Sequence, residues 1–143
     1  MIISTRGRYA LSIMLDIAEH QGGGYVSLRD SAERQKVSKK YLEQIVIIPE
    51  VSEMLESKGG KCGGYRLKKA PEEYTVGEIL RAAEGSICPV SCLDGEGTCS
   101  HKEECSVYPI WQGLDGVINE YLDGITLKDV LDKRVKAVGK DKT

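Results

Sequence analysis

Apolar residues recur at steps of three and four along five segments of the chain, which predicts amphipathic helices. The segments are 7–20, 28–34, 39–48, 75–84 and 108–133. In the first, the apolar face is formed by Tyr9, Leu11, Ile13, Met14, Ile17 and Ala18. The last is expected to be one long helix, with a stripe formed by Trp111, Leu114, Ile118, Tyr121 and Leu122.

Capping residues set the ends of these helices. Ser27, Ser38 and Thr75 stand where an N-cap is expected, and Gly85 stands where the fourth helix must end. Only the four residues "QKVS" separate the second helix from the third, a spacing typical of a helix-turn-helix. Pro49 is expected to end the third helix near residue 48.

A different pattern follows between residues 56 and 70, where glycine pairs flank Lys61 and Cys62 and the residues after them alternate. This predicts a β-hairpin with a basic, glycine-rich tip. Two helices, a recognition helix and a hairpin make up a winged helix-turn-helix. The predicted fold is therefore mainly α: a winged helix-turn-helix DNA-binding domain plus a long C-terminal dimerisation helix.

We accordingly divide the chain into four parts. Residues 1–85 form the DNA-binding domain with its wing at about 56–70, and residues 86–107 form a cysteine-rich loop. Residues 108–133 form the dimerisation helix and C-terminal segment. The polar residues 134–143 are expected to be a disordered tail.

The charge distribution favours a polyanionic partner for the first half only. Residues 1–70 carry 12 Lys and Arg against 8 Asp and Glu, whereas residues 71–143 carry 8 against 14. Chance asymmetry is the simpler alternative. No apolar run reaches membrane-spanning length and the first residues do not resemble a signal peptide, so we expect a cytoplasmic protein without a membrane partner. No catalytic constellation or phosphate-binding loop occurs, so we expect no enzyme.

The third helix carries side chains suited to DNA. Lys39 and Lys40 can neutralise phosphates, Gln44 can pair with adenine, and Glu43 can accept from a cytosine amine. The alternative is an ordinary solvated helix face. At the wing tip, Lys58 and Lys61 can follow the DNA backbone or the minor groove.

Three cysteines lie on a polar loop, "CLDGEGTCSHKEEC", which has no apolar residue after Leu93. Cys92, Cys99 and Cys105 are spaced C-x6-C-x5-C, and thiolates of this kind hold iron–sulfur clusters. A metal or cluster would give the loop the core that its side chains lack. The alternatives are a loop of oxidation-sensitive free thiols or a disulfide.

Several motifs in this order resemble the Rrf-two family of bacterial winged-helix repressors: "STRGRYAL", "KKYLEQI", "GGKCGGYRL", "TVGEILRAAEG" and "ITLKDVL". The resemblance covers about residues 1–133. The three-cysteine loop is similar to the cluster-binding branch, which includes IscR and NsrR, and unlike the CymR branch, whose members lack it.

The resemblance implies a homodimer that binds a palindromic operator in double-stranded DNA. It implies a 2Fe–2S or 4Fe–4S cluster on Cys92, Cys99 and Cys105. It also implies that the following residues contact DNA: Arg6, Arg8, Ser38, Lys39, Lys40, Tyr41, Glu43 and Gln44. The wing lysines Lys58 and Lys61 are added to this set.

The chain departs from the family at the fourth ligand. Tyr108 stands where IscR-like members have a histidine, and Arg8 stands near where NsrR-like members have an acidic ligand. His101, Cys88 or the partner subunit therefore remain candidates. In addition, Ser31 replaces a common isoleucine, which is expected to thin the core there.

The predicted function is a DNA-binding transcriptional repressor that senses iron–sulfur, redox or nitric-oxide status through the cluster. One alternative is a cluster-free regulator of the same fold that responds to thiol oxidation or cysteine metabolism. An alternative from another class is a small iron–sulfur or zinc protein that binds another protein.

Overall fold

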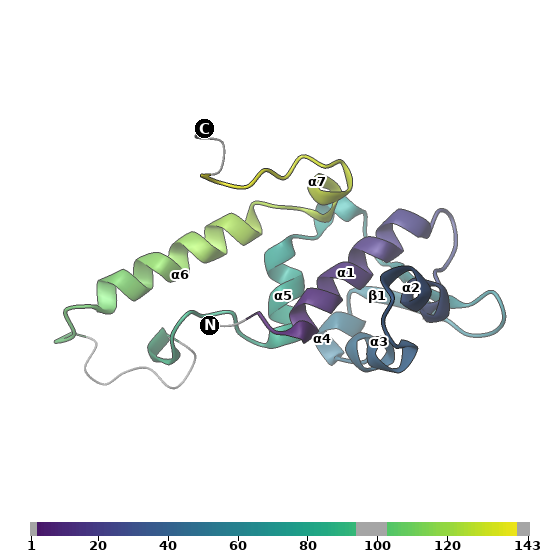
Figure 1. Cartoon of the computed structure of the whole chain (residues 1–143), viewed down its shortest axis with the longest axis horizontal. Coiled ribbons are helices and arrows are strands. Elements are labelled where there is room, and N and C mark those ends of the chain that lie inside the picture. Colours follow the sequence, from purple (N-terminus) through teal and green to yellow (C-terminus); the bar gives the residue numbers. More distant parts are fainter. Residues whose placement is uncertain (1–2, 94–102, 140–143) are drawn as a thin grey trace.

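A computed structural model of the chain describes residues 3–93 and 103–139 as a mainly helical protein with one small sheet (Figure 1). The elements in chain order are α1 (Thr5–His20), α2 (Leu28–Gln35), α3 (Lys39–Val46), α4 (Pro49–Ser52), β1 (Leu55–Lys58), β2 (Gly64–Leu67), η1 (Pro71–Glu73), α5 (Val76–Glu84), η2 (Ser91–Leu93), α6 (Tyr108–Asp123) and α7 (Leu127–Leu131). This order confirms the predicted winged helix-turn-helix with a long helix near its C-terminal end.

The predicted caps form as expected. The hydroxyls of Ser27, Ser38 and Thr75 each accept a hydrogen bond from a backbone N–H three residues later, at distances of 2.9 to 3.1 Å. Helix α3 ends at Val46, and Pro49 opens the short helix α4, where its missing N–H costs no hydrogen bond. The recognition helix is therefore short and fixed at both ends.

Helix α1 lies at the centre of the domain and packs against α2, α3, α5 and β2. Its inward face buries Ala10, Ile13, Met14 and Ile17, each with no exposed surface. These residues share one core with the inward residues of α2, α3 and the wing, namely Leu28, Ala32, Leu42, Ile45, Val46, Leu55 and Leu67. Burial of this apolar face holds the DNA-binding elements around α1.

The wing is the antiparallel hairpin β1–β2, paired from Leu55↔Leu67 to Lys58↔Gly64, close to the predicted range. It is tied to the helix-turn-helix by Val26, whose N–H and C=O both pair with Tyr65 at 2.8 Å. Gly64 permits this contact, because a Cβ at that position would lie 2.2 Å from the carbonyl oxygen of Val26.

The expected single helix over 108–133 is wrong, because the structure has two helices there. Helix α6 ends at Asp123, and Thr126 begins α7 through a reciprocal cap with Asp129. Between them, the N–H of Val76 donates to the carbonyl of Ile125 at 2.8 Å. Leu127 is then fully buried in the core of the DNA-binding domain. The cap at Thr126 thus interrupts the expected long helix, and the chain that follows packs back onto the DNA-binding domain.

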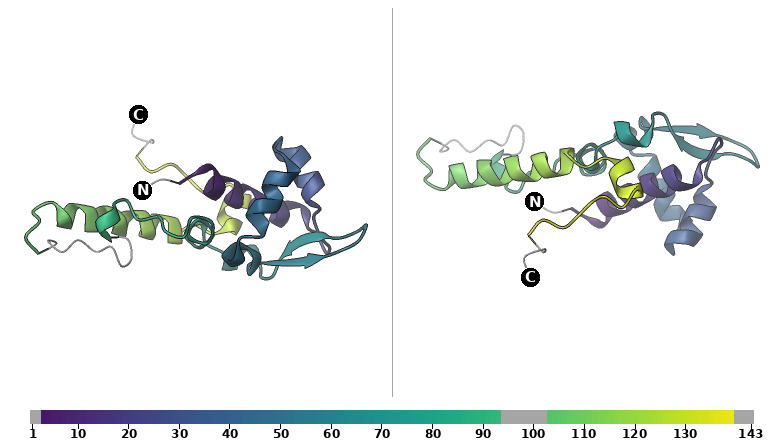
Figure 2. Two further views of the ribbon diagram at one scale, coloured as in Figure 1. Left: turned by 90° about the horizontal axis from the view of Figure 1, so that it is seen from below. Right: turned by 90° about the horizontal axis from the view of Figure 1, so that it is seen from above.

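Helix α6 extends away from the domain on the side opposite the wing (Figure 2). One face packs on α5, where Ile118 and Leu122 contact a small apolar cluster and Arg81 donates to Asn119 and Asp123 at 2.9 and 2.7 Å. The other face carries large apolar side chains that are 41% to 63% exposed: Val107, Ile110, Leu114, Val117 and Tyr121. This second face has no partner among the described residues.

Two further expectations concern the ends of the chain and membranes. Residues 134–139 form no helix or strand, and residues 140–143 lie outside the described part, so the disordered tail stays a prediction. Among the described residues, no helix combines the length and the apolar content that a membrane span requires.

Candidate nucleic-acid interface and cysteine segment

Helix α3 presents a polar face to solvent. Leu42, Ile45 and Val46 point into the core, and this leaves Lys39, Lys40, Glu43 and Gln44 exposed together with the cap residue Ser38. The ammonium of Lys39 lies 3.7 Å from the carboxylate of Glu43, and both side chains are at least half exposed. Such an exposed pair contributes little to stability, so both groups are available to a ligand.

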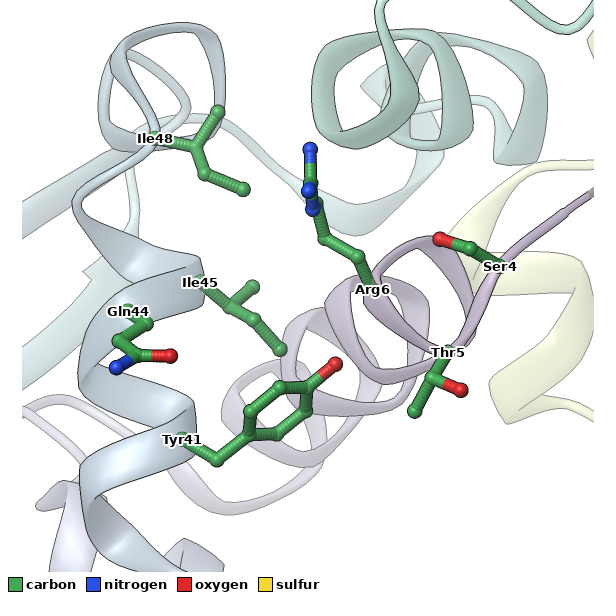
Figure 3. A pocket seen from close by; sticks show the side chains of 7 residues that line it. All are labelled: Ser4, Thr5, Arg6, Tyr41, Gln44, Ile45 and Ile48. Atoms are coloured by element: carbon green, nitrogen blue, oxygen red, sulfur yellow. The ribbon is translucent and has the colours of Figure 1, made fainter.

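Tyr41, which was expected to contact DNA, differs from these residues. It is half-buried, and its ring meets that of Tyr9 edge-on with 5.4 Å between centroids. The contact holds α3 against α1. The Tyr41 side chain also lines the cavity beside α3, where its hydroxyl points toward α1 (Figure 3).

A cavity of about 440 Å³ lies between α3 and the start of α1 (Figure 3). Ser4, Thr5 and Arg6 line it from α1, and Tyr41, Gln44, Ile45 and Ile48 line it from α3 and the residues after it. Arg6 is therefore placed beside the recognition helix. Arg8 lies on the exposed surface nearby, where its guanidinium donates to the Thr5 hydroxyl at 3.2 Å.

A second cavity, of about 510 Å³, lies on the wing side of α3. It is lined by Leu28, Lys40, Glu43, Gln44, Ile47 and Tyr65. Ile47, which was not among the residues predicted to contact DNA, is 69% exposed, although large apolar side chains are usually covered. Its signal in the sequence is its spacing, since it stands three residues after Gln44 and four after Glu43 on the same helical face.

The wing tip carries its charge on the two predicted lysines. Lys58 and Lys61 are exposed, and the Lys58 ammonium lies 5.7 Å from the centre of the Tyr25 ring. Arg66 at the base of the wing is engaged, because its guanidinium donates to Glu56 at 2.9 Å and stacks over Tyr25. The hydrogen bond from Arg66 holds the pKa of Glu56 below its ordinary value.

The cysteine segment joins α5 to α6. Cys92 lies in η2, and Cys105 lies three residues before α6; both are half-buried free thiols. Cys88 is also free and half-buried, and its thiol donates to the carbonyl of Leu93 at 3.6 Å. Cys99 and His101 lie outside the described residues. Among the residues that are described, no three His, Cys, Asp or Glu side chains gather as a metal site.

The sequence pattern of the Rrf2 (Rrf-two) family, described as "Iron-dependent Transcriptional regulator", matches residues 3–133. The chain belongs to the Rrf2 family. It is accordingly a transcriptional regulator with a winged-helix DNA-binding fold.

Individual relatives agree. The HTH-type transcriptional regulator IscR of Aliivibrio salmonicida (strain LFI1238) is 37% identical over 139 residues, which cover 96% of this chain and 82% of that protein. The solved structure of CymR, the global cysteine regulator of B. subtilis, superposes with a TM-score of 0.72 at 34% identity, covering 95% of this chain and 99% of that one. The structure of T. potens IscR gives a TM-score of 0.71 at 34% identity, covering 100% and 97%.

Proposed function

We propose that this Rrf2-family regulator is a homodimeric, cytoplasmic repressor that binds a palindromic operator and is controlled by an iron–sulfur cluster. The observation that carries the DNA-binding part is the arrangement around α3. Its polar face is flanked on one side by Arg6 at the start of α1 and on the other by the wing. A recognition helix with basic elements on both sides suits the major groove and the phosphates that border it.

Each side chain of this surface has a proposed role. Ser38, Lys39, Lys40, Arg6 and Arg8 contact phosphates, because cationic groups and hydroxyls bind the backbone without reading sequence. Glu43 and Gln44 read base edges, and Ile47 offers an apolar contact for a thymine methyl group. Lys58 and Lys61 follow the backbone or the minor groove beside the wing. The Tyr41 hydroxyl is the remaining proposed DNA contact.

The exposed face of α6 supports the dimer. Its apolar residues, Val107, Ile110, Leu114, Val117 and Tyr121, follow one another at alternating steps of three and four, the spacing of a helix that packs against another helix. A second copy of the chain offers the same face. Such an isologous pair has twofold symmetry, which is why a palindromic operator is expected.

The cysteine segment supports a cluster through its donor set. Cys92 and Cys105 are free thiols at its two described ends, and with Cys99 they would supply three thiolates, the ligands that iron–sulfur clusters require. His101, Cys88 or a residue of the partner subunit would complete the set. When bound, the cluster would make the protein responsive to oxidants, to nitric oxide and to the availability of iron. Cys92 and Cys105 would then connect that chemistry to α5 and α6.

A cluster-free thiol sensor of the same fold is the second candidate. Cys62 favours it, because this exposed thiol stands at the tip of the wing, where oxidation would alter the DNA-facing surface. The likeness to the cysteine regulator CymR also supports it. The two candidates differ in whether metal-free protein responds to oxidants.

The DNA-binding proposal is tested by salt dependence. A duplex selected from a random pool should bind the purified chain, with affinity that falls steeply as salt rises, because bound phosphates release counterions. Lys40→Ala should weaken binding to all duplexes, whereas Gln44→Ala should chiefly relax sequence preference. Binding that is absent, or insensitive to salt, would contradict the proposal.

The cluster proposal is tested by anaerobic purification, visible spectroscopy and iron and sulfide assays. The wild-type chain should be coloured and hold iron and sulfide. Cys92→Ala, Cys99→Ala and Cys105→Ala should each lose most of both, whereas the control Cys62→Ala should retain them. Colourless, iron-free wild-type protein that changes its DNA affinity on reversible oxidation would favour the cluster-free candidate.

A further inference from the structure

The first turn of α1 is capped by a carboxylate from another helix. Ser4 is the N-cap residue of α1, but its own side chain makes no capping hydrogen bond. Glu84, the last residue of α5, accepts instead from the backbone N–H of Gly7 at 2.7 Å and from that of Ser4 at 3.3 Å. The Ser4 hydroxyl also donates to the Glu84 carboxylate. A single side chain thus satisfies helix-terminal donors that would otherwise lack a partner.

The charge of Glu84 suits this place. Burial by itself would raise the pKa of Glu84, but the hydrogen bonds from Ser4 and Gly7 and the charge of Arg6 outweigh it and hold the pKa below its ordinary value. Glu84 is therefore ionised at neutral pH. A negative charge at a helix N-terminus is stabilised by the helix dipole.

Gly7 makes the contact possible. A Cβ built at this position would lie 2.7 Å from Oε1 of Glu84 and 3.1 Å from two of its carbons. Gly7 is also buried, and it lies within a regular helix, so no turn in the backbone calls for a glycine at this position. Alanine is the better helix former, by up to about 1 kcal/mol, so the glycine in this first turn is explained by the room that Glu84 needs.

The capped turn carries the arginine of the candidate DNA interface. Arg6 stands between the two capped amides, those of Ser4 and Gly7, and lines the cavity beside α3. On the other side, Gly85 ends α5 with a φ of +84°, and Ile87 is buried against Val76 and Leu80. The helix end that holds α1 is thus also the start of the segment that leads to Cys88 and Cys92.

We propose that Glu84 is a positioning residue for DNA binding: its carboxylate fixes the first turn of α1 and thereby holds Arg6 beside the recognition helix. The inference rests on the proposed DNA-binding function. The partly buried contact of Glu84 with the start of α1 would then serve to place Arg6 at the DNA-facing surface. Packing of α1 on α5 would not by itself require this contact.

The test is the affinity of full-length variants for a duplex selected with the wild-type chain, measured over a range of salt concentrations. Glu84→Gln removes a negative charge, so simple electrostatics predicts tighter binding to a polyanion. The proposal predicts the opposite, a loss of DNA affinity of about tenfold. The slope of log K against log salt should also become smaller, by about one for each phosphate that is no longer bound. Glu72→Gln, an exposed change of equal charge in η1, should leave affinity unchanged or slightly higher.

Gly7→Ala provides a second variant that leaves the charge intact. It displaces the Glu84 carboxylate and also raises helix propensity, so circular dichroism should report a folded, helical protein while DNA affinity falls as in Glu84→Gln. In an Arg6→Gln background, Glu84→Gln should have little further effect on binding. A role in stability alone would instead make the two effects additive.

Wild-type affinity and salt slope in both Glu84→Gln and Gly7→Ala would overturn the inference, and so would additivity with Arg6→Gln. If the wild-type chain itself showed no salt-dependent binding to any selected duplex, the proposed function would fall, and this inference with it. Wild-type binding with unaffected variants would overturn the inference alone.

Discussion

Asp16 is the charged side chain that folding buries within the described residues, with 8% of its surface exposed. The guanidinium of Arg34 donates to both of its oxygens, at 2.8 and 2.7 Å, and so links α2 to α1. Burial acts to raise the pKa of Asp16, but the hydrogen bonds from Arg34 and Ser31 and the charge of Arg34 outweigh it, so the pKa lies below the ordinary 3.8. This pair, and not only the apolar core, fixes the first helix of the helix-turn-helix.

Asp16→Asn is expected to lower the free energy of unfolding at pH 7 by about 2 kcal/mol, because it leaves the Arg34 fork without its charged partner. Because the pKa of Asp16 is lower in the folded chain than in the unfolded one, this stabilisation is fully present at pH values above the ordinary pKa. It is lost as pH falls through the pKa of the folded state. The difference between wild type and variant should therefore shrink in acid. Urea unfolding at pH 7 and near pH 3 would measure it.

The matched control is Glu33→Gln, which breaks the exposed pair with Arg29 at 3.8 Å. It should change stability by less than about 0.5 kcal/mol at either pH. A neutral-pH effect of Asp16→Asn no larger than that of the control would contradict the importance given to the pair.

Ser31, expected to thin the core, is fully buried next to this pair. Its hydroxyl accepts from the side-chain amide of Gln35 at 2.9 Å and hydrogen-bonds to Asp16. The position that lacks an isoleucine therefore belongs to a polar contact between α1 and α2. A buried hydroxyl with partners is tolerated in a core where an unpaired one is not.

At the level of helices and strands, the wing depends on one glycine. Val26, just before α2, pairs with Tyr65 of β2 and thereby fixes the hairpin to the helix-turn-helix. Gly64→Ala should displace that pairing, because the added methyl would overlap the Val26 carbonyl. We expect a loss of about 2 kcal/mol in unfolding free energy, together with weaker DNA binding through the misplaced wing lysines.

Gly59→Ala is the appropriate comparison, since a Cβ there would meet no atom within 4 Å and the backbone is not in the left-handed region. It should leave stability and DNA affinity close to wild type. Thermal unfolding and binding to the selected duplex would separate the two variants. Equal behaviour would show that the close approach of β2 to Val26 is not needed.

Across the molecule as a whole, α6 holds its exposed apolar face well away from the DNA-binding elements (Figure 2). In the proposed dimer, two copies would join through α6 while each keeps its own α3 exposed. Arg81 secures this direction, because it bridges α5 to Asn119 and Asp123. The spacing between the two recognition helices would then be set by how rigidly α6 is attached to α5.

If the proposed α6 dimer forms, Leu114→Glu should make the chain monomeric, because a charge at the middle of the apolar stripe would be buried without a partner on association. Affinity for a palindromic duplex should fall by more than about tenfold, while binding to a single half-site should change little. Gln112→Glu introduces the same charge on α6 outside the stripe and should remain dimeric. Sedimentation analysis and duplex binding would measure both, and a dimeric Leu114→Glu variant would contradict the α6 interface.

Local structure could be predicted from the order of residues alone. Helix periods, the caps at Ser27, Ser38 and Thr75, the stop at Pro49 and the hairpin of the wing all depend on residues a few positions apart. The same local signals reveal the exposed residues of α3 and the cysteine spacing. The start of α7 was missed, because its cap at Thr126 lies inside a pattern that also suits one long helix.

Contacts between distant residues, in contrast, were set by the packing of the folded chain. The cap of α1 by Glu84 joins residues nearly eighty positions apart, and the Asp16–Arg34 and Val26–Tyr65 contacts likewise cross between elements. No sequence period encodes these pairs, because they form only when the buried faces of α1, α5 and the wing come together around one core. Folding also determined which stripe of α6 stays exposed, since packing on α5 uses the neighbouring face that carries Ile118 and Leu122.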